Sequence, residues 1–306
     1  MAETQVEYLD QIVEFLGFLQ SKLRGLKGIA TLTYELIQNA DDVKDLSGNA
    51  GGASMISFDV CDDALIVEND GVFRDVDFER MQRIAFGGKR EEEDTTGAFG
   101  IGFISVYQIT DSPEVFSSGR HWRLCPEKPS GKKIEQRLIP TEKTRFRLPW
   151  AFEESEVRKQ LRLETIQKEH LDKFALEMER AIRLAALFVK YLQVFTLARN
   201  GETLLTLRRS NNNGVIRLDD GTEPVDWQIF SADFHQEASA MRSKLEYLIE
   251  KKKSSEVYIA VPNIPLEQSA LYAILPTEMR LPLPFHISAD FYTNEDRKSI
   301  LLGQDY

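Results

Sequence analysis

Three polar side chains stand at helical spacing in the segment YELIQNADDVKD, namely Glu35, Asn39 and Asp42. Carboxylate and amide groups accept protons or coordinate cations, so a shared face could carry chemistry. On a helix that advances ~100° per residue, Asn39 lies ~40° from Glu35 and Asp42 lies ~20° to its other side. An apolar stripe runs beside them, made of Leu32, Leu36, Ala40 and Val43. The three groups therefore follow one edge of a core-facing helix, although an ordinary solvated helix face gives the same pattern.

A second segment, GAFGIGFISVYQITD, opens an apolar run with Gly97, Gly100 and Gly102. Glycines let a backbone approach a ligand closely, and the start of a helix offers free N–H groups to a phosphate. Many glycine-rich turns are only tight turns. The segment is not a P-loop, because no Lys-Ser/Thr pair follows the last glycine, and no βαβ unit precedes it as a dinucleotide fingerprint requires.

Taken in order, ELIQNADD, VENDG, GAFGIGF and KTRFRLPW resemble the GHKL ATPase superfamily. That superfamily includes gyrase, the ninety-kilodalton heat-shock chaperone, histidine kinases and MutL. Within it the chain is most similar to the sacsin-type branch of heat-shock-chaperone-like domains, which shares the N-D-x-x-F turn and the FRLP strand. The later segment LYAILPTEMRLPLPFHISADF resembles the same branch. Two features depart from the wider superfamily: the D-x-G-x-G turn is here Asp70-Gly71-Val72-Phe73 and lacks the second glycine, and Ala98 replaces a common arginine.

The resemblance implies roles for individual residues. Glu35 would be the general base that activates water, Asn39 would hold Mg²⁺, and Asp42 would shape the pocket near base and sugar. Asp70 would accept a hydrogen bond from the adenine amine, and Thr144 would support the water network beside it. Arg297 would reach the γ-phosphate from the following domain. The remaining nucleotide contacts would come from Phe73, Gly97, Phe99, Gly100, Ile101, Gly102 and Phe103.

These roles predict a Mg²⁺-dependent ATPase module that cycles between conformations within a larger chaperone-like assembly. Its partners would be ATP and ADP, a protein client or partner domain, and a second copy in an ATP-dependent homodimer. The charged loop 87–96 would be the lid over ATP. Two alternatives stay open: an ATP-sensing scaffold without turnover, and a nucleic-acid-processing ATPase. The pathway, quality control or bacterial defence, is not specified by these residues.

Composition narrows the classes of partner, compartment and metal site that remain open. Thirty-eight basic against 49 acidic residues give a net charge of −11, which disfavours nucleic acid as a partner of this segment. No apolar run reaches the ~20 residues of a membrane helix, and the acidic N-terminus lacks a signal sequence, so we expect no membrane contact. Two cysteines, Cys61 and Cys125, in 306 residues fit a reducing, cytoplasmic compartment, and the scattered histidines disfavour a Cys/His metal site.

The predicted fold class is α+β: a GHKL (Bergerat) α/β sandwich with an antiparallel or mixed sheet, followed by a second α/β domain. Residues 1–150 would form the ATP-binding domain and 151–306 a middle or transducer-like domain. Periodicity predicts the following helices and strands. Helices are expected at 6–23, 28–45, 77–86, 153–192 and 236–250, and strands at 55–60, 64–68, 121–124, 134–139, 144–148, 194–199, 203–208, 214–218, 256–261 and 270–275.

Overall fold

A computed structural model describes residues 15–84, 101–244, 255–273, 275–291, 293 and 299–300. The helical elements are α1 (Phe15–Leu23), α2 (Ile29–Asp41), α3 (Asp75–Ile84), η1 (Ile101–Gln108), α4 (Glu156–Leu161), η2 (Lys168–His170), α5 (Leu171–Ala185) and α6 (His235–Lys244). The first strands are β1 (Met55–Val60), β2 (Ala64–Asn69), β3 (Glu114–Ser117), β4 (Arg120–Leu124), β5 (Ile134–Leu138), β6 (Thr144–Pro149) and β7 (Val194–Arg199). The later strands are β8 (Glu202–Asn212), β9 (Val215–Asp219), β10 (Val225–Asp233), β11 (Glu256–Pro262), β12 (Ser269–Ala273), β13 (Leu275–Leu281) and β14 (His286–Ala289).

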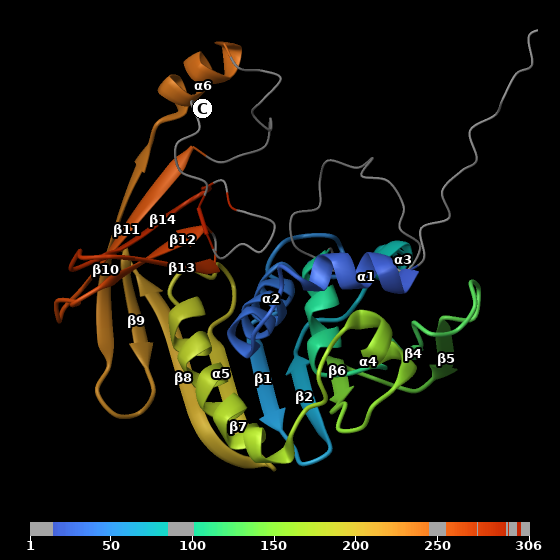
Figure 1. Ribbon diagram of the computed structural model, residues 1–306. Helices are drawn as coiled ribbons and strands as arrows, with labels where there is room; N and C mark the ends of the chain where they lie inside the picture. Colours follow the sequence, from blue (N-terminus) through green and yellow to red (C-terminus); the bar gives the residue numbers. More distant parts are fainter. Residues whose placement is uncertain are drawn as a thin grey trace, which may run out of the picture.

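Within these ranges the strands form one mixed sheet in the order β13-β12-β14-β11-β10-β9-β8-β7-β1-β2-β6-β3-β4-β5. Helices α2 and α5 pack against each other, and α5 lies on β7 and β1 (Figure 1). The predicted α+β class and the mixed sheet are therefore confirmed. None of the helices in the described ranges is long and apolar enough to cross a membrane.

The hairpin predicted at 55–68 is confirmed as β1 and β2, which pair antiparallel with Ile56 opposite Asn69. The other edge of β1 pairs in parallel with β7, so residues far apart in sequence lie side by side. The boundary predicted at residue 150 falls between β6 and α4, and the sheet continues across it through this parallel pair.

The predicted helix 153–192 is two α-helices, α4 and α5, joined by a connection that ends in the short helix η2. Arg162 ends α4 in the left-handed conformation with φ 54°, and the Leu163 N–H bonds back to the Arg158 carbonyl. A left-handed residue cannot continue a right-handed helix, so the chain turns there. Four observed strands were not predicted: β3, β10, β13 and β14.

The three strands β1, β2 and β6 have two different faces. On the helix face, which we define by the buried rows of these strands, the side chains are almost all apolar. Its rows are Ile56–Asn69–Thr144, Phe58–Val67–Phe146 and Val60–Leu65–Leu148. On the open face stand the alternate residues, including the row Ser57–Glu68–Arg145. Because side chains alternate along a strand, neighbours in sequence belong to opposite faces.

Candidate active site

The carboxylate of Glu35 lies against the backbone of Gly102. Glu35 is 4% exposed on α2, and a Cβ added at Gly102 would lie 1.7 Å from Glu35 Oε2. That separation is far below any van der Waals contact, so only glycine permits this approach. The structure thus brings together two residues that the sequence analysis assigned to one site.

Gln108, the last residue of η1, fixes the start of α2 relative to Gly102. Its Oε1 accepts a hydrogen bond from the Gly28 N–H at 2.6 Å, and its Nε2 donates to the Leu26 carbonyl. Gly28 precedes α2 with φ 105°, a conformation that favours glycine. One amide therefore holds η1, which carries Gly102, against the turn that begins the helix of Glu35.

Asn39 lies one turn beyond Glu35 and is 3% exposed, so the two polar groups of the predicted stripe are buried together on α2. Asp42 is half-buried and caps the helix, its N–H donating to the Gln38 carbonyl at 2.9 Å. Burial of this polar edge excludes the plain solvated face as its explanation. The stripe instead lies inside the molecule, beside Gly102 of η1.

Asp41 anchors the other side of α2. Its carboxylate accepts hydrogen bonds from the N–H groups of Lys190, Tyr191 and Leu192, at 2.8, 2.7 and 2.9 Å. These three residues lead directly into β7. Three N–H donors on one buried carboxylate form a strong, charge-assisted contact. The helix that carries Glu35 is therefore tied to the strand that joins the two halves of the sheet.

Asp70 stands elsewhere. Its Oδ1 accepts from the N–H groups of Ser54 and Met55 at 2.8 and 3.0 Å, and its Oδ2 accepts from the Ser54 hydroxyl at 2.5 Å. These contacts fill three of the roughly four acceptor positions of a carboxylate. The hydrogen bonds of Asp70 thus go to Ser54 and Met55 at the start of β1 and not to α2, among the residues that the structure describes. Its observed task is to hold the start of β1.

Asn69, the preceding residue, belongs to the helix face and is 4% exposed. Its Oδ1 accepts the Gly71 N–H at 3.0 Å. A Cβ at Gly71 would lie 2.7 Å from Cγ1 of Val43, so this turn touches the residues that follow α2. Asn69 is opposite Thr144, which is fully buried and shares a 2.8 Å hydrogen bond with the Ser117 hydroxyl. The predicted Thr144 thus lies in the same row as Asn69.

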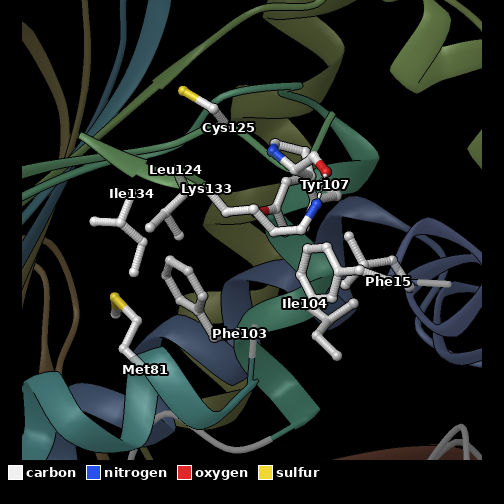
Figure 2. A pocket seen from close by; sticks show the side chains of 11 residues that line it. Phe15, Met81, Phe103, Ile104, Tyr107, Leu124, Cys125, Lys133 and Ile134 are labelled. Atoms are coloured by element: carbon white, nitrogen blue, oxygen red, sulfur yellow. Dashed lines mark hydrogen bonds between the residues drawn. The ribbon is translucent and has the colours of Figure 1, made fainter. Parts of the chain in front are cut away.

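Two predicted nucleotide contacts, Phe73 and Phe103, are core side chains. Phe73 is 2% exposed and meets Phe78 edge-on at 5.2 Å between ring centroids. Phe103 points into an apolar pocket beneath η1, together with Met81 of α3 and Ile134 of β5 (Figure 2). Contacts of these two residues with a ligand would come from the backbone and not from the rings.

Other predicted residues lie outside the described part of the chain. They are Gly97, Phe99, Gly100, Arg297 and the predicted lid 87–96. Ile101 begins η1, but its side chain is likewise outside the description.

Sequence reasoning missed Asn69, Asp41 and Gln108. The first carries only a partial signal in strand parity, because Leu65, Val67 and Asn69 share one face but alternate with Ile66 as well as Glu68. Asp41 and Gln108 carry no such local signal. Their partners lie about 150 and 80 residues away, as the hydrogen bonds to Tyr191 and Gly28 show.

Comparison with known proteins agrees with the motif resemblance. The family model "Sacsin domain" matches residues 52–137. Sacsin of Homo sapiens is 37% identical over 121 residues, which cover 36% of this chain and only 3% of sacsin. A solved structure titled "Crystal Structure of N terminal domain of a DNA repair protein" shares the fold, with a TM-score of 0.50, 12% identity, and coverage of 93% of this chain and 92% of that one. The sacsin-type resemblance is thus confirmed for the matched part of the chain.

Proposed function

We propose that this chain binds ATP with Mg²⁺, hydrolyses it, and uses the cycle to change conformation as part of a chaperone-like protein. The observation that carries the proposal is the apposition of Glu35 and Gly102, with Asn39 one turn further along α2. Because Gly102 has no side chain, the buried Glu35 carboxylate lies directly beside the backbone of the glycine segment, where the proposal places the phosphates. Phosphoryl transfer to water needs chiefly such positioning and charge neutralisation.

The donor set fits Mg²⁺ carried by the phosphates. In the described ranges no cluster of three or more His, Cys, Asp or Glu side chains could hold a metal ion by itself. Mg²⁺ does not require one, because it keeps several waters and binds one or two protein oxygens together with substrate phosphates. Asn39 would supply that amide oxygen. When bound, the ion would neutralise charge on the triphosphate.

The remaining roles follow from the motif resemblance. Glu35 would orient the attacking water and accept its proton. The backbone N–H groups of the glycine segment, Gly97, Phe99, Gly100, Ile101, Gly102 and Phe103, would surround the phosphates. Asp42 would border the sugar, and Arg297 would contact the γ-phosphate. Ordering of the lid 87–96 would couple ATP to homodimerisation or to a protein client.

A second function, ATP sensing without turnover, is favoured by the Asp41 contact. This contact joins the end of α2 directly to Lys190–Leu192, so a displacement of α2 on ATP binding would be transmitted to these residues without hydrolysis. Release of phosphate distinguishes the two functions: the scaffold binds ATP and releases none.

The test measures ATP binding and phosphate release for wild type and two variants. Glu35→Ala should bind ATP but lose roughly 10²- to 10⁴-fold in turnover. Asn39→Ala should lose the part of binding that depends on Mg²⁺. Wild-type turnover in Glu35→Ala contradicts the enzymatic function.

A further inference from the structure

Strand β5 forms one end of the sheet (Figure 1). In the described part of the chain it pairs with β4 on one side, and no strand lies on its other side. Leu138, at the end of β5, is 79% exposed, and Gln136 and Arg137 are exposed beside it. The unpaired N–H and C=O groups of an edge strand are a template for pairing with another chain. This edge can therefore take a further strand.

The hydrogen bonds to β4 show which residues of β5 direct their backbone groups outward. The Lys133 carbonyl accepts the Cys125 N–H at 2.7 Å, and the Ile139 N–H donates to the Gly119 carbonyl at 3.0 Å. In an antiparallel ladder, residues bonded in this way to the neighbouring strand recur at every second position. The alternate residues therefore direct their N–H and C=O groups away from β4, and these are Ile134, Gln136 and Leu138.

The side chains of β5 divide between the two faces of the sheet. The helix face continues to β5 along the row Phe146–Val115–Trp122–Gln136. Within this row the Trp122 Nε1 donates to Gln136 Oε1 at 2.8 Å. Side chains two residues apart share a face, so the apolar residues at both ends of β5 lie there too. Glu135 and Arg137 lie on the open face.

The sequence of β5, IEQRL, is complementary to itself in antiparallel pairing. When two copies of the strand are centred on Gln136, Glu135 of each copy lies opposite Arg137 of the other. Ile134 of each copy then lies opposite Leu138, which gives the exposed leucine an apolar neighbour. The outward backbone groups meet in this same register, and each facing pair exchanges both of its N–H···O=C bonds.

Charge selects this register over its alternatives. A shift by two residues would set Glu135 opposite Glu135, or Arg137 opposite Arg137, and like charges directly opposite are destabilising. Glu135 already pairs with Lys128 of its own chain, and a carboxylate has acceptor positions for a second cation. Pairing about a two-fold axis uses this edge in both copies, so the assembly closes as a dimer.

We propose that β5 is a dimer interface, where a second copy of this chain adds its own β5 and the two sheets become one. The occupant is a second copy because the charges of the strand complement those of the same strand, in the register in which its outward backbone groups meet. No nucleotide takes part, so this dimer is distinct from a homodimer that forms with ATP. It stands whether or not the chain hydrolyses ATP.

The test is sedimentation equilibrium of the full chain at several concentrations, without nucleotide. Wild type should show a reversible equilibrium between monomer and dimer. Arg137→Glu sets carboxylates opposite carboxylates and Glu135→Arg sets guanidinium groups opposite each other, so each variant should dimerise roughly tenfold more weakly or less still. An equimolar mixture of the two variants restores both ion pairs between unlike chains and should recover the dimer. The control is Arg208→Glu, an exposed charge on β8, which is paired on both sides, and it should dimerise as wild type does.

Three results overturn the inference. Wild type that stays monomeric at all concentrations, or that dimerises only with ATP, shows that the edge of β5 does not pair with itself. Dimerisation that both charge reversals leave unchanged assigns the interface to another surface. A mixture that remains monomeric, while both variants are folded by circular dichroism, excludes the register in which Glu135 faces Arg137.

Discussion

The two faces of strands β1, β2 and β6 carry polar residues for different reasons. On the open face, Glu68 and Arg145 form an ion pair at 2.6 Å, with side chains 31% and 54% exposed. On the helix face, Asn69 and Thr144 interrupt rows of apolar side chains and are 4% and 0% exposed. Polar groups on a solvated face are ordinary, whereas a buried amide needs a specific reason.

The same difference in burial separates two successive residues, Asn69 and Asp70, at the end of β2. Asp70 is charged and is therefore the more obvious candidate in the sequence. In the structure its carboxylate oxygens accept hydrogen bonds from Ser54 and Met55. Asn69 is uncharged and lies on the buried helix face of these strands. Parity along the strand, more than residue type, therefore decides which neighbour lies on the buried face.

The largest expected effect is on the helix side of the molecule, at Gly102. Gly102→Ala places a methyl group 1.7 Å from the observed position of Glu35 Oε2, so the carboxylate must move. We expect phosphate release to fall roughly 10²- to 10³-fold, close to the loss of the base itself. The matched control is Gly17→Ala in α1, where an added Cβ meets nothing within 4 Å. That control should keep turnover and gain about 0.5–1 kcal/mol of stability. Full turnover in Gly102→Ala means that Glu35 does not act from this position.

The second-largest effect is expected on stability, at Asp41, which holds α2 to the residues before β7. Asp41→Asn removes the charge that three backbone N–H groups share and presents them with an amide donor. We expect the free energy of unfolding to fall by roughly 2–4 kcal/mol in urea titrations. Asp45→Asn is the control, because Asp45 also accepts from backbone N–H groups, of Ser47 and Asn49, but in an exposed loop. Equal losses in both variants would show that the Asp41 contact does not hold α2 to β7.

Much of the local structure could be predicted from sequence. The hairpin of β1 and β2 was predicted within one residue of its observed bounds, and α2 lies within the predicted helix 28–45. The alternation of apolar residues in strands and their periodicity in helices depend on neighbouring residues alone, so they can be read without knowing the tertiary packing. The break after Arg162 was missed because no glycine or proline marks it, and a non-glycine residue takes φ 54° there.

The candidate site was only partly predictable. Glu35 and Asn39 share one helix, so their alignment follows from spacing alone. Contact of Glu35 with Gly102, and of Asp41 with Tyr191, joins segments that are distant in sequence and depends on how the sheet and helices pack. The parallel pairing of β1 with β7 is of the same kind. Local patterns do not encode such contacts.

A smaller effect, dependent on pH, is expected at Asp70. Burial raises the pKa of Asp70, but hydrogen bonds from Ser54 and Met55 outweigh it and hold the pKa below the ordinary value of 3.8. A carboxyl group with a lowered pKa in the folded state stabilises the fold above about pH 4, and this stabilisation is lost as pH falls through that range. Asp70→Asn should therefore lower the urea midpoint at pH 7 more than at pH 3. A difference that is constant with pH would contradict the hydrogen-bonded carboxylate.

The smallest effect is expected on the open face, where two successive residues of β6 allow a direct contrast. Arg145→Ala breaks the exposed pair with Glu68 and should reduce stability by less than about 1 kcal/mol, and by less again at high salt. Phe146→Ala empties a site that is 3% exposed on the helix face, and should reduce stability by about 3–5 kcal/mol. Urea titrations of both variants measure the two free energies, and nucleotide binding should be unchanged in Arg145→Ala. An exposed ion pair that is screened by solvent contributes little free energy. Comparable losses of stability in the two variants, or loss of nucleotide binding in Arg145→Ala, would therefore mean that the open face also takes part in function.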